Sequence, residues 1–144
     1  MKIIALDLGD QWVGTAITDA SRILARPLQT VTLKDLVSFL HELFSKETIS
    51  TVVIGYPQTL RGTESEQTKK VLKLKDELAV HFPNHQWVLY DERLTSKQAQ
   101  NLGKKGEKLE IHSKAAALIL EGYLMRLKFQ SDLENISNDD YIHE

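Results

Sequence analysis

The stretch "IIALDLGDQWVG", residues 3–14, places an acidic residue near the end of an apolar, β-prone run. Asp7 follows Ile, Ala and Leu residues, and Gly9 and Gly14 come soon after it. A buried carboxylate costs free energy unless a partner or a bound cation compensates its charge. The pattern therefore predicts a strand, a tight turn and a second strand, with Asp7 held where a cation could bind. The simpler alternative is that Asp7 only accepts backbone hydrogen bonds from the turn at Gly9.

Composition and length bound the class of protein. The chain has 144 residues, of which 42% are hydrophobic and 26% charged, as is typical of globular proteins. We expect one domain over residues 1–130 and an acidic, flexible tail over residues 131–144. There are no cysteines, which excludes disulfides and thiolate metal sites. Neither a membrane-spanning run nor a signal-peptide pattern is present, so we expect a cytoplasmic protein without a membrane partner.

The net charge of −2 is unevenly distributed along the chain. Residues 131–144 hold five acidic residues and no Lys or Arg, so the remainder carries a charge of +3. Lysines gather in two clusters, which consist of Lys69, Lys70, Lys73 and Lys75, and of Lys104, Lys105, Lys108 and Lys114. Each cluster alone is compatible with ordinary solvated surface, whereas both together suit contacts with a phosphate backbone.

Hydrophobic periodicity predicts the order of the elements. Strands are expected over residues 2–8, 12–18, 27–32, 51–56 and 86–90. Helices are expected over residues 35–47, 63–81 and 113–128, with a short helix opening at Thr95 and a loop over 103–111. This order, β-β-β-α-β-α-β-α-α, predicts an α/β fold in which helices flank a mixed five-stranded sheet.

Acidic residues follow the ends of two of these strands, where the active sites of such sheets lie. Asp7 ends the first strand, and Asp91 and Glu92 follow the last one. Neighbouring strand residues face opposite sides, so only one of Asp91 and Glu92 can readily share a site with Asp7. His112 stands just before the last long helix and could point toward the same place. Carboxylates suit Mg²⁺ or Mn²⁺, ions that activate water for phosphodiester hydrolysis.

Other residues near these strand ends suit contact with nucleic acid. Glycines allow a backbone to approach closely, and a cation with neighbouring donors can bind phosphate oxygens. The candidates for substrate binding are Gly9, Trp12, Gly14, Gly55, Arg93, Thr95 and Lys97. Strand packing, turn formation and helix capping are the alternatives, and capping explains Thr95 at least as well. His81 and His85 are separated by Pro83, so they do not form a helical metal-binding pair.

Four segments together resemble the sequence blocks of the YqgF family. They are "ALDLGDQWVGTAITD" (5–19), "VVIGYPQTLRGTES" (52–65), "YDERLTS" (90–96) and "SKAAALILEGYL" (113–124), in the family's order. The family is described as Holliday junction resolvases and, in bacteria, as nucleases that process the 5′ end of pre-16S ribosomal RNA. The resemblance implies an RNase H-like fold, shared with the RuvC resolvases, and divalent-metal phosphodiester hydrolysis.

The resemblance also implies a catalytic and metal-binding set of Asp7, Glu92 and His112. Asp7 matches the family's first-strand acid, and Glu92 matches the acid of its Asp-Glu-Arg block. His112 stands where the family's last block has Asp, and Trp12 stands where the first hairpin usually has Arg or Lys. Neutral imidazole binds Mn²⁺ but is a poor ligand for Mg²⁺. His112 therefore marks either a modified metal site or a lost one.

These observations favour a metal-dependent nuclease that processes the 5′ end of pre-16S ribosomal RNA. The alternative is a catalytically impaired RNA-binding factor in ribosome assembly or transcription, with His112 replacing the third acid. A Holliday junction resolvase acting on branched DNA ranks below both. An actin-like ATPase opens with a similar hairpin but needs two lobes, and this chain has room for one. The oligomeric state stays open.

Overall fold

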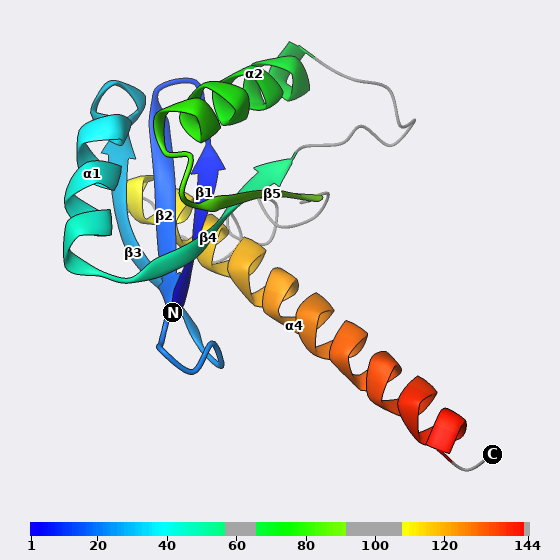
Figure 1. The fold of residues 1–144 in the computed structure, drawn as a ribbon. Coiled ribbons are helices and arrows are strands. Elements are labelled where there is room, and N and C mark those ends of the chain that lie inside the picture. The colour runs from blue at the N-terminus through cyan, green and yellow to red at the C-terminus, as the bar shows by residue number, and fades with distance from the viewer. Residues whose placement is uncertain (57–65, 92–107, 143–144) are drawn as a thin grey trace.

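Five strands form one mixed sheet in the order β3-β2-β1-β4-β5 (Figure 1). The computed structural model describes residues 1–56, 66–91 and 108–142. The first three strands form an antiparallel meander, and β4 and β5 run parallel to β1. The strands are β1 (Lys2–Leu8), β2 (Trp12–Thr18), β3 (Ala25–Thr32), β4 (Ile49–Tyr56) and β5 (Gln86–Asp91). The expected mixed five-stranded α/β fold is confirmed.

Helices cover both faces of this sheet. Helices α1 (Leu36–Lys46) and α2 (Glu66–His81) lie on one face, and α4 (Lys108–Ile142) lies on the other. A short 3-10 turn, η1 (Leu33–Asp35), leads from β3 into α1. The expected short helix at Thr95 and the start of the helix expected at residue 63 lie outside the described residues.

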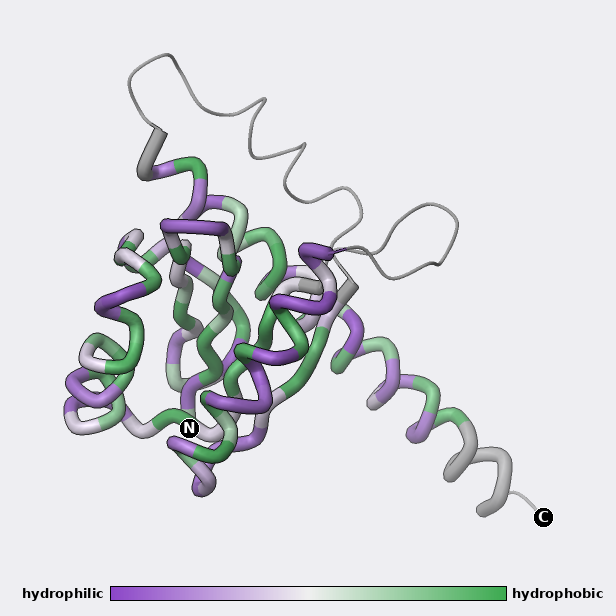
Figure 2. Tube along the Cα trace, turned by 90° about the horizontal axis from the view of Figure 1, so that it is seen from above, coloured by the Kyte–Doolittle hydropathy of each residue, from purple (hydrophilic) through white to green (hydrophobic). Residues whose placement is uncertain are grey.

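Strand β1 is buried on both sides, which explains why its sequence is almost continuously apolar. Ile4, Leu6 and Leu8 enter a hydrophobic cluster shared with α1 and α2. Ile3 and Ala5 enter a second cluster, shared with α4. The tube view shows mainly hydrophobic strands between helices that alternate hydrophobic and hydrophilic residues (Figure 2). Since side chains alternate along a strand, Asp7 lies on the α4 face with Ile3 and Ala5.

The pairing of β2 with β3 changes register between Gly14 and Ala16. Thr15 lies at this irregularity and is fully buried. Its hydroxyl donates to the carbonyl of Gln29 at 2.6 Å and accepts from the Gln29 amide at 3.1 Å. The side chain thereby satisfies backbone groups that the interrupted ladder leaves unpaired, which lets the hairpin bend without losing hydrogen bonds.

Helix α4 is longer at both ends than the sequence interpretation expected. It begins at Lys108, so the second part of the loop expected over 103–111 is helical. It continues through the segment expected to be a flexible tail as far as Ile142. The physical reason is that neither Gly nor Pro follows Gly122, so nothing in the sequence stops the helix. The second half projects away from the sheet (Figure 1).

No helix among the described residues is both long enough and apolar enough to span a membrane.

Candidate active site

Asp7 lies one residue before the end of β1 and is half-buried. Its Cα pairs with that of Gly14 on β2, where the two strands are antiparallel. Both residues belong to the sheet face that α4 covers. The acid predicted to carry the chemistry is therefore placed between the sheet and the start of α4.

Gly14 allows α4 to rest directly on β2. A Cβ atom at Gly14 would overlap the carbonyl oxygen of His112 and lie 2.7 Å from the amide nitrogen of Ser113. The contact is between two backbones, so neither side can move aside as a flexible side chain would. Only glycine allows the backbone of α4 to come this close to β2. The contact fixes the separation between His112 and the Asp7–Gly14 pair.

The His112 ring lies beside Gly9, in the turn between β1 and β2. The Gly9 amide donates to the carbonyl of Trp12 at 2.9 Å and closes the turn. A Cβ atom at Gly9 would lie 2.8 Å from that same carbonyl oxygen and 3.9 Å from Cε1 of His112. The structure thus gathers Asp7, Gly9, Gly14 and His112 at one place, while the side chain of Trp12 is half-buried in the same hairpin.

The ends of β4 and β5 lie on the same side of the molecule as this hairpin end. Gly55 is buried and pairs with Tyr90, and it directly follows Ile54, which pairs with Leu6. Tyr90 packs its hydroxyl against Gly122 of α4, in the space that a Cβ atom there would occupy. Glu92 is the next residue after β5. Four predicted site residues lie outside the described residues, namely Glu92, Arg93, Thr95 and Lys97.

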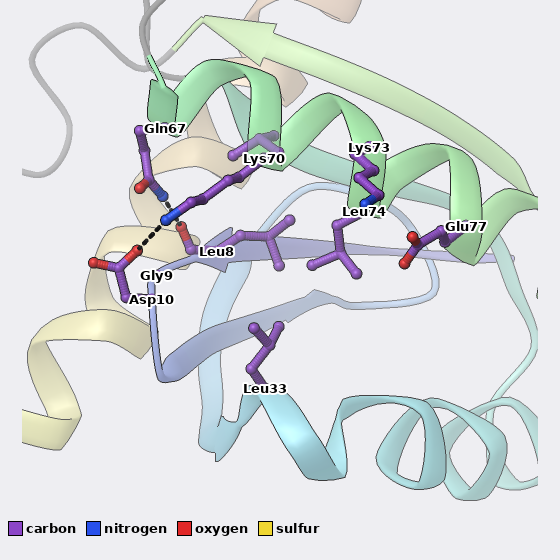
Figure 3. A pocket seen from close by; sticks show the side chains of 10 residues that line it. Leu8, Gly9, Asp10, Leu33, Gln67, Lys70, Lys73, Leu74 and Glu77 are labelled. Carbon is purple, nitrogen blue, oxygen red and sulfur yellow. Dashed lines mark hydrogen bonds and ion pairs between the residues drawn. The ribbon is translucent and has the colours of Figure 1, made fainter.

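A cavity of about 420 Å³ borders the same hairpin from the other face of the sheet. It lies between α2 and the β1–β2 turn, and its lining includes apolar side chains and two lysines, Lys70 and Lys73 (Figure 3). Lys70 Nζ lies 3.9 Å from Asp10 Oδ1, in an exposed and therefore weak ion pair. Gln67 Nε2 donates to the carbonyl of Leu8 at 3.4 Å.

The sequence pattern indicated the lysines of α2 as phosphate contacts but missed Asp10 and Gln67 as their neighbours. Gln67 lies one helical turn before Lys70, whereas only the packing of α2 beside the β1–β2 turn brings Asp10 to Lys70. In the second lysine cluster, Lys114 lies 3.7 Å from Glu110 on α4. Lys104 and Lys105 lie outside the described residues.

The donor set is compatible with a divalent cation but incomplete among the described residues. Asp7 offers carboxylate oxygens and His112 offers an imidazole nitrogen. The described part of the chain contains no cluster of three or more His, Cys, Asp or Glu residues that could hold a metal ion. A mixed oxygen and nitrogen set suits Mn²⁺ better than Mg²⁺. Glu92, the third residue predicted for this site, lies outside the described ranges.

Solved structures of known proteins identify the class of fold. A structure titled "T. thermophilus RuvC in complex with Holliday junction substrate" matches with a TM-score of 0.53 at 15% identity, over 89% of this chain and 96% of that one. A second T. thermophilus RuvC structure matches with a TM-score of 0.50 at 14% identity, over 89% and 97% of the two chains. The fold is therefore the RNase H-like fold of the RuvC resolvases.

Sequence comparisons identify the family. A family model described as "RuvX: Holliday junction resolvase" matches residues 1–126. A relative from Rubrobacter xylanophilus is 36% identical over 127 residues, which cover 85% of this chain and 91% of the relative. A relative from a Sulfurihydrogenibium species is 35% identical over 143 residues, which cover 94% and 98%. Both carry the name "Putative pre-16S rRNA nuclease". The chain belongs to the RuvX (YqgF) family of nucleases, enzymes that hydrolyse phosphodiester bonds.

Proposed function

We propose that this protein is a divalent-metal-dependent nuclease that processes the 5′ end of pre-16S ribosomal RNA in the cytoplasm. The observation that carries the proposal is the convergence of Asp7 and His112 at a glycine-lined hairpin. The names of the relatives favour an RNA precursor over branched DNA as the substrate. A Holliday junction remains the second substrate to test, because the matched family model carries that description.

Asp7, Glu92 and His112 are the proposed catalytic and metal-binding residues. The resemblance to the YqgF family favours Glu92 over Asp91 as the partner of Asp7. A bound Mg²⁺ or Mn²⁺ ion would supply an activated water and stabilise the leaving oxygen. The protein's own contribution is to hold a carboxylate and an imidazole in fixed positions, through β1 and through the backbone contact at Gly14.

The proposed substrate contacts surround this pair on two sides. Gly9, in the β1–β2 turn, is the proposed point of approach for a nucleic-acid backbone, and Trp12 offers an aromatic ring beside it. Gly14 is covered by the backbone of α4 and Gly55 is buried, so these two glycines would shape the site rather than face the substrate. Arg93, Thr95 and Lys97 are the proposed donors next to Glu92. Lys70 and Lys73 extend the positive surface onto α2. Since such contacts displace counterions from phosphates, the affinity for RNA should fall steeply as salt is raised.

A second function, binding without cleavage, is favoured by one observation. Among the described residues, the site offers one carboxylate, that of Asp7, and the imidazole of His112. The family's pattern has a further acid at the position of His112. In that case the protein would act as an RNA-binding factor in ribosome assembly or transcription. The two functions predict the same affinity for RNA and differ only in turnover.

The test is an incubation of purified protein with a 5′-extended 16S ribosomal RNA precursor and, separately, with a four-way DNA junction. Mg²⁺ and Mn²⁺ are compared, and Asp7→Asn is the control for contaminating nuclease. We expect RNA cleavage in Mn²⁺ that Asp7→Asn abolishes. Cleavage of the junction alone would replace the proposed substrate. Binding without cleavage of either substrate would establish the binding function instead.

The role of His112 has a separate test in the His112→Asp variant. Because the carboxylate restores an oxygen ligand, we expect its cleavage activity in Mg²⁺ to rise relative to that in Mn²⁺ by about tenfold or more. The measurement is the ratio of initial cleavage rates with the two ions. His112→Asn is the matched control, since it has a similar size and no charge. An unchanged ratio in His112→Asp would show that residue 112 does not contact the metal.

A further inference from the structure

Two histidines from different helices face each other on the side of the sheet opposite α4. His41 lies within α1, and His81 is the last residue of α2. Their Nε2 atoms are 3.3 Å apart, and both side chains are exposed to solvent. The residues are separated by 40 positions in sequence, so only the packing of the two helices brings them together.

A buried aromatic ring holds both imidazoles in place. Phe82 is 7% exposed and belongs to the hydrophobic core. Its ring centroid lies 4.9 Å from that of His41 and 4.9 Å from that of His81, at interplanar angles of 65° and 62°. Edge-to-face packing of this kind restricts the orientations of both rings. Contact with this buried ring therefore helps to hold the two exposed imidazoles in their relative positions.

The separation of the two nitrogen atoms matches that of two ligands on one metal ion. Zinc–nitrogen bonds of about 2.0–2.1 Å at a tetrahedral angle place the two nitrogens about 3.3 Å apart. We propose that His41 and His81 form a two-imidazole site for a transition-metal cation of the Zn²⁺ class. Imidazole suits Zn²⁺, Cu²⁺ and Ni²⁺, whereas Mg²⁺ prefers oxygen. Water fills the remaining coordination positions, since both side chains are exposed.

This site is distinct from the candidate active site. Helix α2 starts near Leu8, where Gln67 donates to the Leu8 carbonyl. From there the helix runs alongside β1 toward the other end of that strand (Figure 3). It ends at His81, just before the start of β5. The active-site candidates lie at the other ends of the parallel strands. A metal at His41 and His81 would therefore link α1 to α2 without contacting Asp7 or His112.

The test is a calorimetric titration of Zn²⁺ into the untagged full-length chain. Asp7→Asn is used as the background, so that zinc binding at the candidate active site is weakened in every sample. We expect one site in this background, and an affinity at least about tenfold lower when either His41→Gln or His81→Gln is added. His85→Gln is the matched control, because it removes a neighbouring histidine that is not part of the pair and should leave the affinity unchanged.

Thermal unfolding provides a second readout that does not depend on the heats of binding measured by calorimetry. A ligand that binds only the native state raises its apparent stability, so Zn²⁺ should raise Tm in the Asp7→Asn background but not when His41→Gln is added. Circular dichroism of each variant checks that the helices are intact. Zinc binding that survives both substitutions, or no zinc binding at all, would overturn the proposal. The pair would then be only a hydrogen bond between two imidazoles.

Discussion

Gly14 is the residue on which the relation between Asp7 and His112 depends. It is the partner of Asp7 in the β1–β2 ladder, and its missing side chain admits the backbone of α4. An acid and an imidazole that are 105 positions apart in the sequence (112 minus 7) thus approach each other because residue 14 has no side chain.

We therefore expect Gly14→Ala to lower the free energy of unfolding by about 2 kcal/mol or more, because the methyl group must push α4 away from β2. Metal-dependent cleavage should be lost as well. Gly122→Ala is the matched comparison, since the obstacle there is the end of the Tyr90 side chain rather than a backbone. Urea unfolding measures the loss of stability in each of the two variants. Equal losses in the two variants would show that α4 is not held by its backbone contact.

His85 predicts a dependence of stability on pH. Its ring stacks on Phe44 at 3.9 Å between centroids, and burial lowers the pKa of His85 below its usual value of 6.5. The unfolded chain therefore takes up a proton at a higher pH than the folded chain does. The stabilisation is complete above about pH 6.5 and is lost as the pH falls toward the folded-state pKa.

The measurement is urea unfolding at about pH 8 and about pH 5.5, for the wild type and for His85→Phe. Phenylalanine keeps the stacking on Phe44 but cannot bind a proton. We expect the wild type to lose more stability on acidification than the variant does. The same loss in both proteins would assign the pH dependence to other groups.

At the scale of the element, the β2–β3 pair depends on one buried hydroxyl. Thr15→Val keeps the shape of the side chain but leaves both backbone groups of Gln29 without their partner. We expect the free energy of unfolding to fall by about 1–3 kcal/mol, measured by urea unfolding. Gln29→Ala is the control, because its exposed side chain is not part of this interaction. A comparable loss in the control would contradict the proposed role of the hydroxyl.

The strands could be predicted from the sequence, but several of the contacts between elements could not. Strand β1 was recognisable because both of its faces are buried, which leaves an apolar run that only Asp7 interrupts. The close approach of α4 to Gly14 depends on a distance between layers, which hydrophobic periodicity does not contain. The His41–His81 pair has no sequence signal, because its members belong to different helices.

The end of α4 is set by a property other than the apolar periodicity of the sequence. The helix was expected to stop at Lys128, where the apolar face directed at the sheet ends. Apolar side chains beyond that point, Phe129, Leu133 and Ile136, are exposed and contribute nothing to the core. Helix continuation depends on local backbone preference as well as on burial, and no Gly or Pro interrupts this segment. The resemblance to the YqgF family, rather than periodicity, is what singled out Glu92 and His112.

At the scale of the whole molecule, we expect the second half of α4 to be dispensable for the folded body. The family match ends at residue 126, and residues 131–136 are exposed. We expect a chain that ends at Lys128 to keep its Tm within about 2 °C. Its affinity for RNA should increase at low salt, because the deletion removes five acidic residues and leaves a net charge of +3.

Thermal unfolding and filter-binding assays at two salt concentrations measure these effects. A substitution control keeps the helix and removes two of the five negative charges, through Asp132→Asn and Glu134→Gln. This variant should show part of the increase in affinity. A large fall in Tm on truncation would instead mean that the projecting half of the helix supports the core.

The length of α4 gives the molecule a mechanical property. A helix of 35 residues is about 50 Å long, and His112 lies four residues after its start. The helix is a lever: its packing on the sheet is the fulcrum, the short arm bears His112, and the long arm extends beyond the body. Because His112 and the long arm belong to one continuous helix, a tilt of the long arm by a few degrees would move the imidazole relative to Asp7.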